Sequence, residues 1–278
     1  MKIGIEMPHS FLSLVVLTVC RQIVGLCTRR DSSIWVIDKA FYIVLSFRCI
    51  SAVFNIIHDC DEVFNYWEPL HYVLYGYGQQ TWEYSAEFAL RSWWYILIHY
   101  VLGYPVKLIA GEHAGKVAVF YWIRLVLACS TGVLEWLLYK AISRYSRIVG
   151  RLYVLLTCFS TGMFVSASAF LPSSFAMGAM TAAAAGVLCQ SHCSVVFASV
   201  IGSVWGWVVA SLGFVPYALW VLFACPRVKS FRCLGIGLVV SLVPLVYVDK
   251  LYYGSWKVGC WFSCAVLLIC VAGFRSKY

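Results

Sequence analysis

The chain has 278 residues, of which 62% are hydrophobic and only 12% are charged, and its mean hydropathy is +0.83. Soluble domains carry about twice this share of charge, so the composition excludes a soluble globular domain, a disordered chain and a secreted disulfide scaffold. Because each crossing takes about 20 apolar residues, the length allows roughly six to nine membrane-spanning helices. The composition therefore predicts an all-α protein, a polytopic transmembrane helical bundle.

The net charge of +9 comes from 21 Lys and Arg residues against 12 Asp and Glu residues. The basic residues are scattered between apolar runs, a distribution that membrane topology explains better than nucleic-acid binding. The 13 cysteines include no CxxC pair and lie mostly inside apolar runs, where cysteine behaves as a small hydrophobe. We therefore expect no nucleic-acid partner, no disulfide framework and no structural zinc site.

The N-terminal segment, 1–33, contains an apolar run that is too short for a crossing, and we expect it to be cytosolic or interfacial. The first transmembrane helix is predicted over 34–57. It carries Asp38, Lys39 and Arg48, which are costly in hydrocarbon unless they face protein or reach the interface.

The segment 58–91 inverts the charge pattern of the rest of the chain. No Lys or Arg occurs between Arg48 and Arg91, yet half of the 12 acidic residues lie there. Since basic residues favour the cytosolic side of a membrane, this segment is predicted to lie on the other side. Its acidic residues are Asp59, Asp61, Glu62, Glu68, Glu83 and Glu87.

The region 92–258 is predicted to hold the remaining transmembrane helices. The apolar run at 195–224 contains Gly213 and Pro216, so we expect a broken helix or two short crossings there. The further predicted spans are 92–110, 117–139, 152–171, 175–190, 233–248 and 259–273.

The topology that follows from these spans conflicts with the charges at one point. The connection at 140–151 carries Lys140, Arg144, Arg147 and Arg151 and should be cytosolic. Two predicted crossings separate it from the acidic segment, which by parity places both on one side. Either one predicted span is wrong or this basic connection departs from the rule.

The adjacent carboxylates of the acidic segment are candidates for acid–base chemistry. Asp61 and Glu62 point about 100° apart on a helix, where Glu62 would align with Asn65 and Tyr66, and Asp61 with Asn65 and Glu68. In an extended chain, Asp59 and Asp61 would share a face. In either case one carboxylate can face a substrate while its neighbour perturbs its pKa or binds another group. The alternative is that these are solvated loop charges.

Two further chemistries are conceivable for the same segment. His58 and His71 flank the carboxylates and could complete a metal site, but no second cluster supports one. Trp82 and Tyr84 could stack on a sugar ring, or they could belong to an interfacial aromatic belt.

Three stretches resemble one enzyme family. DCDEVFNYWEPLHYVLYGYGQQTWEYSAEFALRSWWY at 59–95 closely resembles the first lumenal loop of the endoplasmic-reticulum mannosyltransferases that use dolichyl-phosphate-mannose, glycosyltransferase family 22. It is most similar to the alpha-1,2-mannosyltransferase branch of asparagine-linked glycan assembly. STGMFVSASAFLPSSFAM at 160–177 and VDKLYYGSWKV at 248–258 resemble the same family.

The resemblance implies a C-type glycosyltransferase fold in the endoplasmic-reticulum membrane, with the active-site loop in the lumen. The donor would be dolichyl-phosphate-mannose, held by its polyprenyl chain among membrane lipid, and the acceptor a lipid-linked oligosaccharide. Transfer would invert the anomeric centre, with Asp61 as the base and Glu62 as second candidate, and would need no metal or other cofactor. Expected substrate-binding residues are Asn65, Glu68, His71, Trp82, Glu83 and Arg91, the last of them as the partner of the donor phosphate.

The segment 259–278, GCWFSCAVLLICVAGFRSKY, departs from the family, so we expect a chain truncated at its C-terminus with an unrelated apolar tail. Two other functions stay open from the sequence. One is an inactive fragment that associates with the complete enzyme. The other is a lipid or sugar transporter that uses Asp38, Lys39 and Arg48 as a polar pathway.

Overall fold

A computed structural model describes residues 36–224 and 227–254, and these ranges contain helices and no strand. The all-α prediction is confirmed. The helices are α2 (Lys39–Phe54), α3 (Cys60–Glu62), the π-helix η2 (Val63–Trp67), α4 (Glu68–Tyr75), the 3-10 helix η3 (Trp82–Tyr84), α5 (Trp93–Ser143), α6 (Arg147–Phe159), α7 (Thr161–Ser166), α8 (Pro172–Leu188), α9 (His192–Val204), the 3-10 helix η4 (Val208–Phe214), α10 (Val215–Ala224) and α11 (Arg227–Tyr253). The predictions for 1–33 and 259–278 fall outside the described residues.

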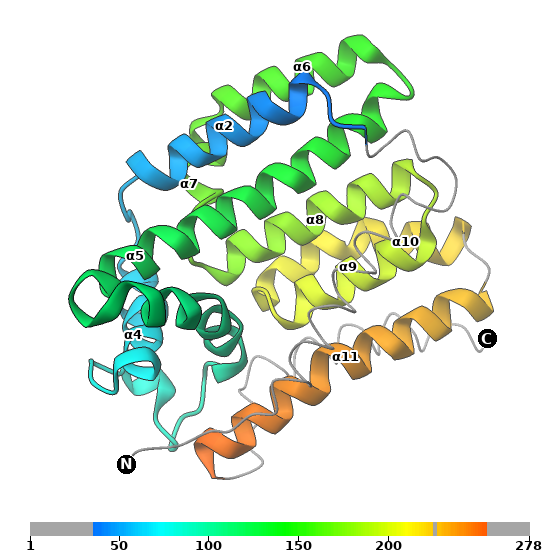
Figure 1. The fold of residues 1–278 in the computed structure, drawn as a ribbon. Coiled ribbons are helices and arrows are strands. Elements are labelled where there is room, and N and C mark those ends of the chain that lie inside the picture. Colours follow the sequence, from blue (N-terminus) through cyan, green and yellow to red (C-terminus); the bar gives the residue numbers. More distant parts are fainter. Residues whose placement is uncertain (1–35, 225–226, 255–278) are drawn as a thin grey trace.

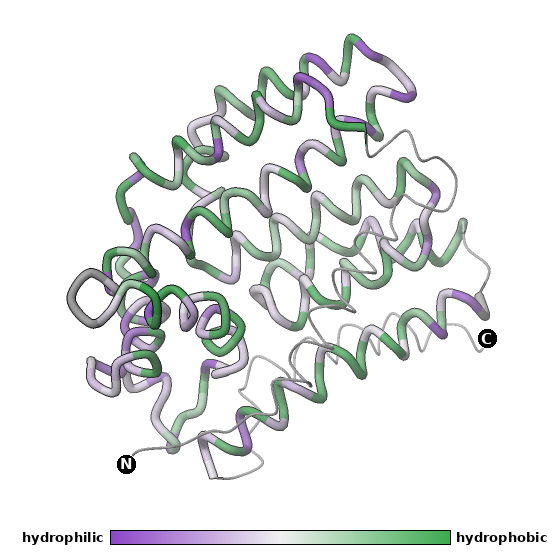
Figure 2. The backbone as a smooth tube through the Cα atoms, viewed as in Figure 1, coloured by the Kyte–Doolittle hydropathy of each residue, from purple (hydrophilic) through white to green (hydrophobic). Residues whose placement is uncertain are grey.

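The long helices lie side by side and run between two ends of the molecule (Figure 1). The acidic segment 58–91 lies at one end, which we call the acidic end. The start of α2, the α5–α6 connection and the start of α11 lie at the other, which we call the basic end. Figure 2 shows hydrophilic residues at both ends and mainly hydrophobic residues along the helices between them, the distribution expected of a membrane bundle.

Helix α5 is two helices that meet at Gly111, whose φ of 73° and ψ of −177° are not helical. The two parts fold back on each other, since Trp122 Nε1 donates to the Leu102 carbonyl at 3.1 Å. A Cβ on Gly103 would lie 3.1 Å from Val119 Cγ1, so the missing side chain permits this close approach.

The first part of α5, residues 93–110, stays within the acidic end. Arg91, just before it, pairs with Asp61, and Lys107 near its far end donates to the Leu74 carbonyl. Both ends of this helix therefore contact the segment 58–91, so the expected crossing at 92–110 is corrected to a helix packed along that segment.

Among the described residues, two helices are long and apolar enough to cross a membrane, Gly115–Ser143 and Lys229–Tyr253. Of these two helices, only Gly115–Ser143 lies between the acidic segment and the basic residues at 140–151 in the chain. One candidate span, rather than two, then separates these segments, an arrangement that agrees with their opposite charges.

Two other predicted spans are interrupted. The run 152–171 divides at Ser160, which ends α6 and caps α7 by accepting from the Met163 amide at 3.4 Å. The run 195–224 divides into α9, η4 and α10, which confirms that this run is interrupted, as predicted. Pro216 stands in the first turn of α10, where the missing N–H costs nothing.

Two of the three charges of the first predicted span, Asp38 and Arg48, contact protein, whereas Lys39 is exposed. Helix α2 begins after Asp38, whose Oδ1 accepts from the Phe41 amide at 3.2 Å. Arg48 and Glu135 are both 0% exposed and form a bidentate pair with N–O distances of 2.8 and 2.9 Å. Arg48 Nη2 also donates to the Thr157 carbonyl at 2.8 Å. Arg48 thus faces protein, as its cost in hydrocarbon requires, and in this structure it joins three helices.

A disulfide between Cys193 and Cys233 joins the starts of α9 and α11. One bridge is not a disulfide framework, but the spacing of the cysteines did not predict this pair. The two residues are 40 positions apart and become neighbours only when α9 and α11 pack together.

Candidate active site

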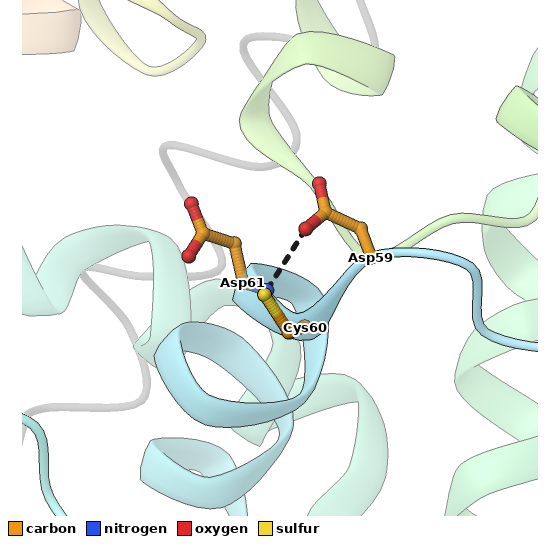
Figure 3. A group of neighbouring side chains, drawn as sticks. All are labelled: Asp59, Cys60 and Asp61. Atoms are coloured by element: carbon orange, nitrogen blue, oxygen red, sulfur yellow. Dashed lines mark hydrogen bonds between the residues drawn. The ribbon is translucent and has the colours of Figure 1, made fainter.

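The acidic segment is a series of short helices rather than a plain loop. Asp59 caps α3, because its Oδ1 accepts from the Asp61 amide at 2.9 Å (Figure 3). The π-helix η2 then places each carbonyl opposite the amide five residues later, as in the bond from the Glu68 amide to the Val63 carbonyl. This spacing changes which side chains of the segment share a face.

Asp61 presents its carboxylate to solvent, with 58% of the side chain exposed. Its Oδ1 accepts from Asn65 Nδ2 at 3.2 Å, so the predicted alignment of Asp61 with Asn65 on a helix is confirmed. Its Oδ2 lies 3.6 Å from Arg91 Nη2. The carboxylate is therefore oriented from two sides and still open to a third group.

Glu62 is placed differently, since only 3% of it is exposed. Its Oε1 accepts from Trp67 Nε1 and from the Phe170 amide, both at 3.0 Å. Trp67 follows Glu62 by five residues, the spacing of the hydrogen bonds in a π-helix. The bond to Phe170 joins the acidic segment to the connection between α7 and α8. Glu62 therefore has a structural role, as a buried acceptor that links two parts of the chain.

Replacing Glu62 by alanine should lower the free energy of unfolding by roughly 2–4 kcal/mol, because two buried donors lose their acceptor. Replacing it by glutamine keeps an oxygen acceptor of the same reach and should cost under about 1 kcal/mol. Thermal unfolding of both variants in detergent checks this. Equal destabilisation by the two substitutions would contradict the bonding described here.

Arg91 lies at the centre of the polar network. Its Nε pairs with Glu83 and its Nη1 donates to the Tyr66 hydroxyl, while the guanidinium also lies over the Tyr66 ring at 5.2 Å. Burial raises the pKa of the Tyr66 hydroxyl to about 12, although the Arg91 charge opposes the shift. Burial alone would lower the pKa of Arg91, but the hydrogen bond to Glu83 and nearby groups raise it, so the guanidinium stays charged.

Asn65 is buried and links the carboxylate to the second half of the segment. Its Oδ1 accepts from Thr81 Oγ1 at 2.8 Å, and its carbonyl accepts from the Tyr84 hydroxyl at 2.8 Å. Asn65 thus fixes Asp61 to the chain around η3.

Three other predicted site residues lie outside this network. Glu68 Oε2 accepts from the Gln79 amide at 3.1 Å, and His71 Nδ1 lies 3.0 Å from the Tyr77 carbonyl. Both therefore shape the turn after α4. Trp82 is 59% exposed and packs edge-on against Phe88, which leaves a ring face available to a ligand.

Sequence reasoning missed the part of the site that comes from the end of α11. Asp249 Oδ1 accepts from Ser92 Oγ and from the Trp93 amide, both at 2.9 Å. The Tyr253 hydroxyl donates to the Arg91 carbonyl at 2.5 Å. Asp249 and Tyr253 belong to the VDKLYYG stretch, so that motif positions Arg91 from a distance of 162 residues along the chain.

The ligand atoms of Asp59, Cys60 and Asp61 lie within 4.8 Å of one another and are exposed, so this group could hold a cation (Figure 3). Asp59 is already engaged as a helix cap. His58 instead contacts Asn55, with 3.1 Å between Nε2 and Oδ1, and His71 contacts Tyr77, so neither histidine joins this group. The expectation that the reaction needs no metal stays a prediction.

The sequence matches the model of one protein family and several of its members. The model of the Alg9-like mannosyltransferase family matches residues 39–262. The chain is 42% identical to the alpha-1,2-mannosyltransferase ALG9 of Arabidopsis thaliana over 214 residues, 75% of this chain and 36% of the relative. It is 39% identical to the human alpha-1,2-mannosyltransferase ALG9 over 225 residues, 78% of this chain and 36% of the relative.

A more distant match is the GPI mannosyltransferase 3 of Kluyveromyces lactis, 38% identical over 71 residues, 25% of this chain and 11% of the relative. The chain thus spans about a third of the length of the alpha-1,2-mannosyltransferases that it matches. No solved structure matches.

Proposed function

Because the chain belongs to the Alg9-like mannosyltransferase family, we propose that it transfers mannose in alpha-1,2 linkage to a lipid-linked oligosaccharide during N-glycan precursor assembly. The proposed donor is dolichyl-phosphate-mannose, and the proposed location is the endoplasmic-reticulum membrane with the acidic end in the lumen. The observation that carries the proposal is the environment of Asp61, whose carboxylate is held by Asn65 and Arg91 and is still exposed to solvent.

Asp61 is the proposed general base. Transfer from a beta-linked donor to an alpha-linked product requires an acceptor hydroxyl to attack the anomeric carbon from the face opposite the leaving phosphate. A carboxylate within hydrogen-bond reach takes the hydroxyl proton as the bond forms. Asp61 has an exposed carboxylate that can accept this proton, whereas Glu62 is buried and committed to Trp67 and Phe170.

Arg91 acts, in this proposal, as a positioning residue rather than as the partner of the donor phosphate. In-line displacement puts the base and the leaving group on opposite faces of the sugar. Inverting glycosidases likewise keep their two catalytic carboxyl groups about 6.5–9.5 Å apart, which leaves room for the attacking water. Arg91 Nη2 is only 3.6 Å from Asp61 Oδ2. Arg91 therefore lies on the face of the sugar that the base approaches, too close to Asp61 to bind a phosphate that leaves from the opposite face. Lys107 and Lys116, which lie against Tyr75, are then the candidate cations for the phosphate.

A rescue experiment tests the proposed function. Cells that lack their own alpha-1,2-mannosyltransferase of this family accumulate an unfinished lipid-linked oligosaccharide, and expression of this protein should restore its elongation. The added mannose should be removable by an alpha-1,2-specific mannosidase. Expression at the membrane without any elongation, or with a product resistant to that enzyme, would contradict the proposal.

Removal of divalent cations should leave the transfer rate within about twofold, since phosphate needs no further activation as a leaving group when protein cations bind it. The measurement is transfer from dolichyl-phosphate-mannose with and without excess EDTA. A loss of activity that Mg²⁺ or Mn²⁺ restores would instead assign a cation to the group around Asp59 and Asp61.

Replacing Trp82 by alanine should raise the KM for the oligosaccharide acceptor roughly 5-fold and change stability little, because an exposed ring that stacks on a sugar contributes about 1 kcal/mol to binding. Trp207, 43% exposed in the connection between α9 and η4, is the matched control and should leave the KM unchanged. An equal effect of the two substitutions would remove Trp82 from the acceptor site.

A further inference from the structure

A pocket of about 270 Å³ lies at the basic end, on the opposite side of the bundle from Asp61. The residues that line it come from the start of α2, the end of α5 and the start of α6. They are Asp38, Tyr139, Lys140, Ser143, Arg144, Arg147 and Arg151. Four cations and one carboxylate make this pocket strongly positive, and the proposed transfer reaction uses none of them.

The charges of the pocket are only partly balanced within the described chain. Asp38 Oδ2 lies 3.5 Å from Lys140 Nζ, and Asp38 Oδ1 accepts from Trp136 Nε1 at 3.1 Å. Arg147 and Arg151 form no ion pair with any residue in the described ranges. Ser143 Oγ is buried and makes no hydrogen bond in this part of the chain. The pocket therefore offers an anion two cations, Arg147 and Arg151, that have no ion-pair partner in the described ranges.

The surface beside the pocket is apolar. On α6, exposed hydrophobic residues recur at helical spacing along one face, and Arg147 and Arg151 flank that face near its start. This stripe consists of Ile148, Leu152, Leu155, Leu156 and Phe159. At 1.5 Å per residue the stripe from Ile148 to Phe159 is about 17 Å long, close to the depth of about 15 Å of one bilayer leaflet.

We propose that the basic pocket binds the phosphate of an anionic phospholipid, with the acyl chains along the exposed apolar face of α6. Free phosphate shares the headgroup chemistry, but it would leave the stripe beside the pocket without a partner. The pocket also lies where the candidate span Gly115–Ser143 ends, and the end of a helix that crosses a bilayer is the level at which lipid headgroups lie. A bound lipid would fix the packing of α2, α5 and α6 at the end of the bundle opposite the proposed active site.

Native mass spectrometry of the full 278-residue chain in detergent tests this. With equal amounts of phosphatidylserine and phosphatidylcholine, the wild-type chain should retain one phosphatidylserine molecule in preference. The double variant R147Q/R151Q should weaken that retention roughly 30-fold, since each cation near an anionic lipid contributes about 1 kcal/mol. The control K229Q/R232Q removes two exposed cations from the start of α11, also at the basic end, and should change retention less than about twofold.

Three results would overturn the proposal. Equal retention of the two lipids by the wild-type chain would do so without any variant, even if R147Q/R151Q failed to fold. Equal weakening by the two double variants would assign the effect to general charge rather than to the pocket. Displacement of the lipid by 10 mM inorganic phosphate would assign the pocket to free phosphate, whereas retention in its presence supports the lipid.

Discussion

Replacing Asp61 by asparagine is expected to lower the rate of mannose transfer by about 10²–10⁴-fold, the usual contribution of a general base. Asparagine keeps the size of the side chain and an oxygen that can accept from Asn65 Nδ2, so the local structure should persist. It cannot take a proton from the acceptor hydroxyl. The measurement is the transfer rate at saturating donor and acceptor, in a form of the protein whose wild-type sequence supports transfer.

Asp59 supplies the matched control for Asp61. It lies two residues away, is exposed and carries the same charge, but it caps α3. Asparagine caps helices as well as aspartate, so D59N should keep the rate within about threefold. If D61N kept more than a tenth of the activity, or if D59N lost as much as D61N, Asp61 would not be the base.

The second large effect concerns the stability of the bundle. Replacing Arg48 by methionine or Glu135 by leucine should each lower the free energy of unfolding by about 3–5 kcal/mol, because each leaves one buried charge without its partner. The double variant R48M/E135L removes both charges and should lie within about 1–2 kcal/mol of the wild type. Unfolding of all four proteins in one detergent forms a double-mutant cycle.

A strongly favourable coupling between Arg48 and Glu135 is therefore expected, although the pair adds little net stability. Additive losses in the cycle would contradict the bidentate contact. The same cycle bears on the transporter alternative, which needs Arg48 as part of a polar pathway. Arg48 is instead 0% exposed and committed to Glu135 and Thr157.

The sequence was informative where a property is local. The absence of Lys and Arg between Arg48 and Arg91 located the candidate site, and helical periodicity paired Asp61 with Asn65. The predicted end of a helix at residue 110 agrees with the break at Gly111. Each of these follows from charge or from residues a few positions apart.

Properties that depend on distant contacts could not be predicted in the same way. The roles of Asp61 and Glu62 differ because Glu62 meets the Phe170 amide, 108 residues away. The return of residues 93–110 along the acidic segment depends on Lys107 reaching Leu74. The pairing of Arg48 with Glu135 joins residues 87 apart, although two charges within apolar runs signal that each needs a partner.

The most direct measurement is mannose transfer by purified protein in defined membranes. Dolichyl-phosphate-mannose and a nucleotide-linked mannose are offered in parallel with the lipid-linked oligosaccharide acceptor. The proposed function predicts transfer from the lipid donor alone, in a linkage that an alpha-1,2-specific mannosidase cleaves, and its loss in D61N but not in D59N. Transfer from the nucleotide donor, or an unchanged rate in D61N, would contradict it.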